Sequence, residues 1–425
     1  MTILILHQFP LAPFPYPTWL RESGRDLVLL GSRHRIEYAG ESVPTRVPGY
    51  RHVEFLGTGD SSTRADRAVA LTESFGVTGV VALHEADLQL AAELRLALDA
   101  PGMLPADVWP FRDKLEMKRR AAAAGIEVAA HAVVTTADDV RRFAALHGLP
   151  LVIKDRSGYS SIGLHILRTR YELEGYLTGQ LPDGVRADED VLMESFVPGR
   201  MCHVDGLVVN GHVALSWPSQ YQYSLASFAE DRAPRIDVTL DREDPLTERL
   251  QRFTDQLLGA LGPADASYAF HVEVFLTEDD RLVLCEVACR PGGARVRDIQ
   301  QLLFGVNTAE YATRLQAGLP VAGLAGPELP QPKGMAGQVV LMRRPGVVRQ
   351  VPEAPRQGWV RAFDVVARPG QVLGPPTYSS DFVMSAVVSA PDRATCERRL
   401  RALGEQFAAG LRMTPLPGQR LEASG

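Results

Sequence analysis

The feature that most constrains the fold is an alternation of short apolar runs and helical stretches over residues 1–112. Four runs rich in Val, Ile and Leu have the length of buried strands. They are TILIL (2–6), DLVLLG (26–31), VEFL (53–56) and VTGVVAL (77–83). Helical stretches lie between them, notably at 61–75 and 86–98. Because strands that alternate with helices form βαβ units, this region is predicted to be a largely parallel sheet. Residues 7–17 follow the first strand, at the end of such a sheet where ligands bind.

The residues that follow predict mixed α+β units. A charged amphipathic helix, RDKLEMKRRAAAAG, opens the second unit, and shorter strands and helices follow it. The third unit carries two hairpins, one of which turns at Asn210-Gly211, and a long amphipathic helix at 245–261. A linker is expected at 321–333. The four units are predicted at 1–112, 113–195, 196–330 and 331–425.

The composition is that of an ordinary globular protein, with 45% hydrophobic and 23% charged residues in a chain of 425. The net charge is −6, whereas a chain that grips nucleic acid more often has a basic balance. No apolar run approaches the ~20 residues of a membrane span, and the first run lacks the basic segment of a signal peptide. The four cysteines, without a CxxC spacing, argue against a disulfide scaffold. We therefore expect a cytoplasmic protein without nucleic-acid or membrane partners.

Lysine is rare in this chain, so each lysine is informative. Lys and Arg together number 45, but the lysines are only Lys114, Lys118, Lys154 and Lys333. Lys118 lies in a KRR run and is expected on a solvated helix face. Lys154 ends the strand PLVIKD and precedes the turn RSGYSSIG, whose small residues let backbone N–H groups approach an anion. This motif predicts either a phosphate site, with Lys154 as its point charge, or an exposed hairpin loop.

A second motif is the acidic hairpin YAFHVEVFLTEDDRLVLCEVACR. Its turn places Glu273 and Glu286 side by side on neighbouring strands. Such a pair makes a site for a hard cation, typically Mg²⁺, that also needs phosphate oxygens. The alternative is a solvated hairpin face. That alternative is weakened because both glutamates lie in apolar strands, where an unpaired carboxylate is destabilising. Arg290 follows, just before a Pro-Gly-Gly turn.

The third motif is VLMESFVPGR at 191–200. An apolar strand runs into Glu194 and then into an extended segment, whose free backbone groups are able to read an adenine edge beside Val197. Taken alone, this motif is better explained as a strand that leaves a domain. His271 fits either a phosphate contact or a hydrogen-bonded buried residue. The aromatic segment 217–228 fits either a pocket wall or a cover over the core. The histidines lack zinc-ligand spacing.

These motifs occur in a fixed order with Lys114 upstream, and as a set they make the chain resemble the ATP-grasp superfamily. The matching parts are the two lysines, the S-x-G-L turn from Ser161 to Leu164, MESFVPG, and HVEVF…CEVACRPGG. The resemblance covers roughly residues 85–320. It implies an α/β and α+β protein with the ATP-grasp fold. This fold comprises an N-terminal Rossmann-like domain, a mobile lid subdomain, a catalytic subdomain, and a C-terminal α+β extension similar to that of biotin carboxylases and bacterial L-amino-acid ligases.

The resemblance also implies residue roles. The implied ATP-binding residues are Lys114, Lys154, Ser161, Gly163, Glu194, Ser195, Phe196, Val197 and His203. The lysines are expected at the phosphates, the serine- and glycine-rich turn over the γ-phosphate, the segment from Glu194 at the adenine, and His203 or Asp205 at the ribose. Glu273 and Glu286 are implied to bind one or two Mg²⁺ ions, with Mn²⁺ as a substitute. Arg290 is implied to be the catalytic residue, at the substrate carboxylate and the transferred phosphoryl group.

This sequence departs from the family pattern at three positions. Ala288 replaces the asparagine that many relatives have near the second metal ligand, and Met201 replaces an acid for the ribose. Asp155 follows the strand-end lysine instead of a small residue or proline. The lid turn is also poorer in glycine than that of biotin carboxylases, which argues against bicarbonate chemistry.

The activity implied by the resemblance is that of an ADP-forming carboxylate–amine ligase. A carboxylate attacks the γ-phosphate of Mg·ATP, and an amine, expected to belong to an amino acid, then takes the acyl group to give an amide. One alternative passes the acyl phosphate to a carrier-protein thiol or to bicarbonate. Another is a nucleotide-binding regulatory protein without catalysis. The expected partners are a small carboxylate and a small amine, and a homodimer is expected because relatives often form one.

Overall fold

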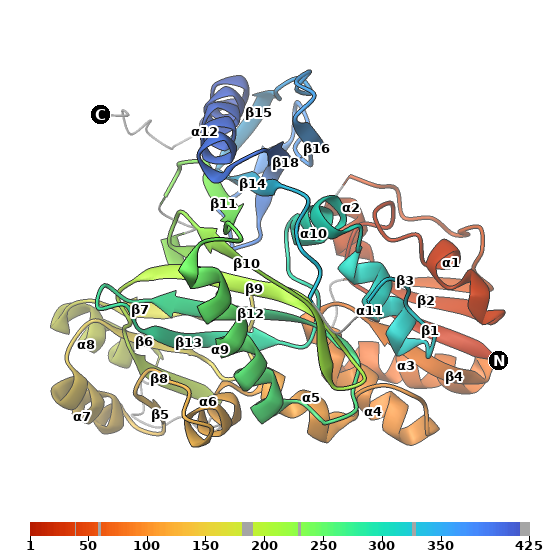
Figure 1. Cartoon of the computed structure of the whole chain (residues 1–425), viewed down its shortest axis with the longest axis horizontal. Coiled ribbons are helices and arrows are strands. Elements are labelled where there is room, and N and C mark those ends of the chain that lie inside the picture. Colours follow the sequence, from red (N-terminus) through yellow and green to blue (C-terminus); the bar gives the residue numbers. More distant parts are fainter. Residues whose placement is uncertain (39, 58–60, 181–189, 228–230, 325–328, 417–425) are drawn as a thin grey trace.

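The computed structural model describes residues 1–38, 40–57, 61–180, 190–227, 231–324 and 329–416. A long antiparallel sheet forms the body, with the N-terminal unit at one end, the lid unit at the other and the C-terminal unit above it (Figure 1). The linker expected at 321–333 lies partly outside the described residues. Within the described ranges, no helix is both long enough and apolar enough to cross a membrane.

The first unit is a four-stranded parallel sheet with the order β3-β2-β1-β4, as the alternation of strands and helices predicts. Its elements are β1 (Thr2–His7), α1 (Tyr16–Trp19), β2 (Asp26–Ser32), α2 (Arg33–Tyr38), β3 (His52–Leu56), α3 (Ser61–Phe75), β4 (Val77–Ala82) and α4 (Leu88–Leu98). Both faces of this sheet are covered. Leu4 and Val28 pack with α3 and α4, whereas Ile3 and Leu29 pack with α1 and with α11 (Thr308–Gln316). Burial on both faces explains why these strands are apolar throughout.

The lid unit is an antiparallel sheet with the order β5-β8-β6-β7. Its elements are β5 (His131–Val133), α7 (Ala137–His147), β6 (Leu151–Asp155), β7 (His165–Leu167), α8 (Arg170–Gln180) and β8 (Val191–Ser195). Two helices precede it, α5 (Pro105–Arg112) and α6 (Lys114–Ala123). Met117 and Ala121 of α6 are buried in the core of the central unit rather than in the lid. The boundary expected after residue 112 therefore falls between two helices that pack together.

The central sheet has eight strands in the order β13-β12-β9-β10-β11-β14-β18-β16. The central unit contains β9 (Arg200–Val209), β10 (His212–Tyr221), β11 (Arg235–Thr239), α9 (Pro245–Leu261), β12 (Tyr268–Leu276), β13 (Leu282–Ala288) and α10 (Val296–Phe304). The C-terminal unit contributes β14 (Met335–Met342), β16 (Val360–Val365) and β18 (Phe382–Ala390). Hydrogen bonding therefore continues across the boundary expected after residue 330.

Helix α12 (Arg393–Gly410) covers the C-terminal end of this sheet. A separate small sheet is formed by β15 (Gly346–Gln350), β17 (Val372–Leu373) and β19 (Arg412–Thr414). The site described below lies where the C-terminal unit, the first unit and the central sheet meet.

The β9–β10 hairpin turns at Asn210 and Gly211, as the sequence predicts. Their φ angles are 50° and 78°, in the left-handed region that a two-residue turn of this kind requires. A Cβ atom on Gly211 would lie 1.8 Å from the carbonyl oxygen of Ala264. This position therefore needs glycine for two reasons, its backbone conformation and the close approach of a neighbouring chain segment.

Gly211→Ala is expected to lower the free energy of unfolding by about 1–3 kcal/mol, because both the φ angle and the contact become unfavourable. Gly259 in α9 provides the matched control, since a Cβ there meets nothing within 4 Å. Gly259→Ala should raise stability by about 0.5–1 kcal/mol through helix propensity. Thermal unfolding of both variants measures the difference, and equal shifts would contradict the assignment.

Candidate active site

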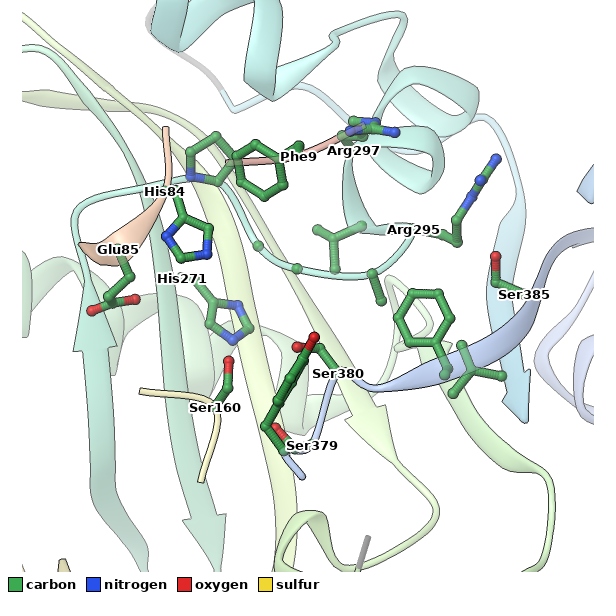
Figure 2. Close-up of a pocket in the computed structure, with 18 of the residues that line it drawn as sticks. Phe9, His84, Glu85, Ser160, His271, Arg295, Arg297, Ser379, Ser380 and Ser385 are labelled. Carbon is green, nitrogen blue, oxygen red and sulfur yellow. The ribbon is translucent and has the colours of Figure 1, made fainter. Parts of the chain in front are cut away.

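A cavity of about 390 Å³ lies between the first unit, the central sheet and the C-terminal unit. Its wall includes Glu273, Glu286 and Arg290 from the acidic hairpin, and Ser160 and Ser161 from the lid turn. Figure 2 shows the acidic-hairpin side near His271 and the C-terminal side near Ser385. The tertiary structure thus brings the acidic motif and the lid turn to a single hollow.

The two acidic side chains lie side by side, which confirms the prediction from the hairpin. Glu273 on β12 pairs in register with Glu286 on β13. A Glu286 oxygen lies 2.8 Å from Nζ of Lys114. One oxygen of Glu273 lies 3.4 Å from both the Tyr221 hydroxyl and Nε2 of His271. Burial acts to raise the pKa of Glu273, but the hydrogen bond with His271 and the charge of that imidazole lower it overall, which favours the ionised carboxylate.

A buried cluster of lysines lies beside this pair. The Glu194 carboxylate is 3.2 Å from Nζ of Lys118 and 2.9 Å from Nζ of Lys154. Burial acts to lower the pKa of Lys154, but Glu194 raises it overall. Lys118 is fully buried, so the prediction of a solvated face for it is wrong. The physical reason is that α6 packs against β13 and α9, a contact that the local KRR pattern does not reveal.

The lid turn is held by a hydrogen bond from Lys114, the first residue of α6. Nζ of Lys114 donates a hydrogen bond of 2.6 Å to the carbonyl oxygen of Gly158. Ser160, Ser161 and Gly163 have φ angles of 53°, 59° and 71°. Left-handed residues in sequence are typical of turns whose N–H groups converge on an anion. The expected γ-phosphate turn therefore has a suitable backbone, and Lys114 connects it to the acidic pair.

A second cleft, of about 460 Å³, contains the segment expected at the adenine. Ser195, Phe196 and Val197 line it together with the turn of the acidic hairpin. The N–H groups of Ser195 and Phe196 donate to the carbonyl oxygens of Ala130 and Pro150, at 2.8 and 3.3 Å. Within the described ranges, the Val197 N–H has no hydrogen-bond acceptor. One backbone donor of this segment is therefore available to a ligand.

Arg290 is held by an acid that the sequence motifs did not reveal. Its Nε lies 2.6 Å from a Glu85 oxygen, and Nη1 donates 2.9 Å to the Pro291 carbonyl. Arg112 binds the other oxygen of Glu85. Burial acts to raise the pKa of Glu85, but Arg290, Arg112 and Lys114 lower it to about 2. In the sequence, the feature of Glu85 that indicates a functional residue is its position just after β4, at the carboxyl end of a parallel strand.

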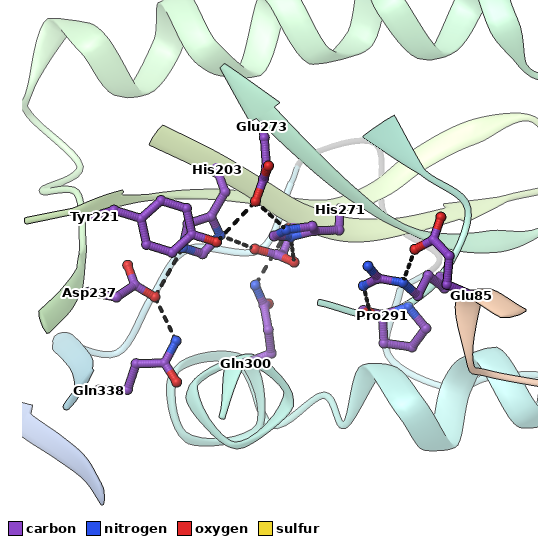
Figure 3. A network of polar contacts seen from close by, with 11 residues as sticks. Glu85, His203, Tyr221, Asp237, His271, Glu273, Pro291, Gln300 and Gln338 are labelled. Atoms are coloured by element: carbon purple, nitrogen blue, oxygen red, sulfur yellow. Dashed lines mark hydrogen bonds and ion pairs between the residues drawn. The ribbon is translucent and has the colours of Figure 1, made fainter. Parts of the chain in front are cut away.

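A chain of buried polar contacts leads from Glu273 into the C-terminal unit (Figure 3). Nδ1 of His271 lies 2.9 Å from Asp205, and Asp205 also binds Nδ1 of His203. Nε2 of His203 lies 3.0 Å from Asp237, which accepts a hydrogen bond of 2.8 Å from Gln338 on β14. The C-terminal unit is therefore connected to the acidic pair.

The pKa values of the two histidines in this contact network, His203 and His271, are both raised, which favours their protonated forms. Burial acts to lower the pKa of His271, but Asp205 raises it to about 9. The pKa of His203 is raised well above its ordinary value by Asp237 and Asp205, against the effect of burial. Atoms of His203, Asp205 and His271 lie within 4.8 Å of one another, and a metal bound there would have to displace protons from the imidazoles. Because both nitrogens of His203 contact acids, the ribose role expected for it is not supported.

Two questions left open by the sequence are answered here. His271 is a hydrogen-bonded buried residue that also lines the cavity. The aromatic segment 217–228 serves both expected purposes within its described part. Trp217 is buried in the core, whereas Tyr221 and Tyr223 line the cavity.

Comparison with known proteins identifies relatives of the central part of the chain. The family model "D-ala D-ala ligase C-terminus" matches residues 121–301. An N5-carboxyaminoimidazole ribonucleotide synthase of Mycobacterium tuberculosis is 29% identical over 214 residues, which are 49% of this chain and 46% of that protein. A D-alanine–D-alanine ligase of Pseudomonas entomophila is 29% identical over 220 residues, 48% of this chain and 65% of that protein. The matches span less than two thirds of either relative.

Solved structures resemble nearly the whole chain. An L-amino acid ligase from Bacillus licheniformis superimposes with a TM-score of 0.76 and 19% identity, covering 98% of both chains. The biotin carboxylase domain of a Hydrogenobacter thermophilus 2-oxoglutarate carboxylase gives a TM-score of 0.71 at 14% identity, covering 97% of this chain and 90% of that chain. The chain therefore has the ATP-grasp fold. Within that fold, the family match and the relatives relate it to the carboxylate–amine ligases, enzymes that form carbon–nitrogen bonds.

Asp205→Asn is expected to lower the free energy of unfolding by about 3–5 kcal/mol near pH 6, because two buried imidazolium groups lose a shared carboxylate. A histidine whose folded pKa exceeds 6.5 stabilises the fold below that pH, and the contribution is lost as the pH rises through the folded value. The deficit of the variant should therefore shrink as the pH rises through about 9, the pKa of His271.

Denaturant unfolding at pH 6 and pH 9.5 measures this effect. The matched control is Asp280→Asn, which removes an exposed acid paired with Arg249 at 2.8 Å. That change should alter stability by less than about 1 kcal/mol at either pH. A deficit of Asp205→Asn that does not depend on pH would contradict the charged state assigned to the two histidines.

Proposed function

We propose that this chain is an ATP-dependent, ADP-forming carboxylate–amine ligase that makes an amide bond through an acyl phosphate. The observation that carries the proposal is the single cavity in which Glu273 and Glu286 share a wall with Arg290 and the lid turn. Phosphoryl transfer needs a cation site, positive charge at the moving oxygens, and a cover that excludes water. The cavity offers residues suited to each of these requirements.

The acidic pair fits Mg²⁺. Both carboxylates reach the cavity, and their side chains are 17% and 26% exposed. Hard cations prefer such oxygen ligands, and Ala288 on the same wall adds none. When bound there, one or two Mg²⁺ ions would neutralise phosphate oxygens. The Hydrogenobacter thermophilus structure is a complex with MgADP and bicarbonate, which supports a site for a nucleotide and magnesium in this fold.

The nucleotide is proposed to lie between the lid sheet and the central sheet. Val197 would donate its free N–H to the adenine, and Lys154 and Lys114 would face the phosphates. In this structure those two ammonium groups neutralise Glu194 and Glu286. Because each lysine already has a carboxylate partner, it is held in place before the nucleotide arrives. Such preorganisation lowers the cost of binding.

Arg290 is proposed to act in the chemical step. Glu85 fixes its guanidinium at the cavity wall, where it would hold the substrate carboxylate in line with the γ-phosphate. The carboxylate oxygen forms a bond to phosphorus as the bond to ADP breaks, and the guanidinium bears charge on the moving oxygens. The amine then attacks the acyl carbon, phosphate leaves, and the amine gives up a proton. An amino acid as one substrate is supported by the likeness to the L-amino acid ligase.

The test is substrate-dependent ADP release with a panel of carboxylates and amines, followed by product analysis. Release should require both substrates and give an amide; a carboxylated or thioester product would redirect the proposal to another acceptor.

Glu286→Gln should remove most activity even at millimolar Mg²⁺, because the amide keeps the shape but loses the charge. Glu243→Gln, on an exposed turn, is the matched control and should keep wild-type turnover. Full activity of Glu286→Gln would place the cation elsewhere.

Arg290→Ala should reduce turnover by at least about 100-fold, on the scale of other lost charge-stabilising groups. Arg112→Ala is the matched variant, because Arg112 binds the same Glu85 carboxylate but is not among the residues that line the cavity. Both changes should lower the melting temperature to a similar extent. If turnover per folded molecule fell equally in both variants, Arg290 would be structural rather than catalytic.

A further inference from the structure

The cavity wall away from the acidic pair is rich in arginine. The arginines that line the cavity are Arg35, Arg235, Arg290, Arg295 and Arg297. The acids that line it are Glu85, Glu273, Glu286 and Asp364. Glu273 and Glu286 belong to the acidic hairpin, and Glu85 binds Arg290 and Arg112. The remaining wall therefore has more positive charges than negative ones.

Arg297, the second residue of α10, is only weakly neutralised. Its guanidinium carbon lies 4.5 Å from the ring centre of Phe14. In the described part of the chain, it donates no hydrogen bond, and its nearest carboxylate is that of Asp298 at 4.0 Å. Asp298 lies 2.8 Å from Arg295, so it is already engaged. The side chain of Arg297 is 17% exposed, which leaves the guanidinium accessible from the cavity.

Two further arginines of the wall contact only neutral groups among the residues that the structure describes. Arg35 donates to the Tyr378 hydroxyl at 2.6 Å, and Arg235 donates to the Ser227 hydroxyl at 3.1 Å. Neither has a carboxylate within 4.0 Å among the residues that the structure describes. Arg235 is only 1% exposed. Two cations on this wall thus have neutral partners alone, and the third, Arg297, has only the distant carboxylate of Asp298, which Arg295 shares.

Such an arrangement is unfavourable unless a ligand completes it. A desolvated cation without an anion is destabilising, and two arginines that share one carboxylate repel each other. Burial lowers the pKa of Arg297, because removal from water disfavours the charged form of the guanidinium. The cation–π contact with Phe14 helps to hold the guanidinium at this wall, and a guanidinium there is able to bind an oxyanion through two hydrogen bonds.

We propose that the substrate that fills this cavity carries two oxyanion groups: the carboxylate that reacts, and a second carboxylate or phosphate that Arg297 binds. This inference rests on the proposed function for the identity of the first group. Arg290 and the acidic pair receive the reacting carboxylate at one end, and Arg297 binds the second oxyanion towards the other. Figure 2 shows Arg297 beyond Phe9, away from Glu85. A cavity of about 390 Å³ is of the size that holds a small molecule of this kind.

The test uses two pairs of acids that match in size but differ in one charge, namely glutamate with glutamine and succinate with its monoamide. A third pair, phosphoserine with serine, differs by a whole phosphate group. The amine is supplied as an amino-acid amide, so that the acceptor brings no carboxylate. Two readouts are measured, the ligand-induced shift in melting temperature and the KM for ADP release. The third pair separates a phosphate from a carboxylate as the second group.

The wild-type protein should prefer the more highly charged member of at least one pair by roughly 30-fold or more, the scale of a truncated charge pair. Arg297→Gln should erase this preference. Arg297→Lys should retain part of it, since the charge remains but the planar fork is lost. Arg249→Gln, which removes a half-buried arginine outside the cavity wall, should retain it fully.

The two readouts separate this inference from the proposed function. If no pair supports ADP release, the proposed ligase activity fails, but the melting-temperature shifts still test the second oxyanion. A preference for the charged member that Arg297→Gln erases sustains the inference in either case. It is overturned if the wild-type protein does not discriminate by charge in either readout, or if Arg297→Gln discriminates as the wild type does.

Discussion

The site depends first on the buried carboxylate of Glu85. This residue belongs to the first unit, directly after β4, and it binds Arg112 and Arg290 from two separate segments of the chain. Because Glu85 is only 3% exposed, loss of either arginine would leave charge uncompensated in a region from which water is largely excluded. The contact therefore holds the first unit against the central unit. It also holds Arg290 on the wall that carries the acidic pair.

Hydrogen bonds make the C-terminal unit part of the site as well. Gln338 on β14 donates to Asp237, and its carbonyl oxygen accepts from the Arg295 N–H at 2.9 Å. One side chain of the C-terminal unit thus touches both the histidine network behind Glu273 and the start of α10, where the arginine-rich wall begins. The continuous sheet from β11 to β14 provides the rigid frame for these contacts. The last unit is consequently a structural component of the cavity.

Local patterns were sufficient for many elements. The apolar runs of the first unit, the Asn-Gly turn and the helix at 245–261 all appear where their periodicity or turn chemistry indicates. Helices α10 and α11 were not predicted, although their residues cover the site. The burial of Lys118 was also missed, because a lysine beside two arginines has the same local pattern on a solvated face and against a buried glutamate. Those differences arise from packing between segments distant in sequence.

The sequence alone determined which motifs are present and which residues face each other within one hairpin or turn. Glu273 faces Glu286 because a short connection sets the register of adjacent strands, and such pairing is local. Partners more than a hundred residues apart were decided only by tertiary structure. Glu85 meets Arg290 because β4 and β13 end close together, and Gln338 meets Asp237 because β11 and β14 pair in register. The charge of each buried group depends on these neighbours, since a low-dielectric interior stabilises an ion only beside its counterion.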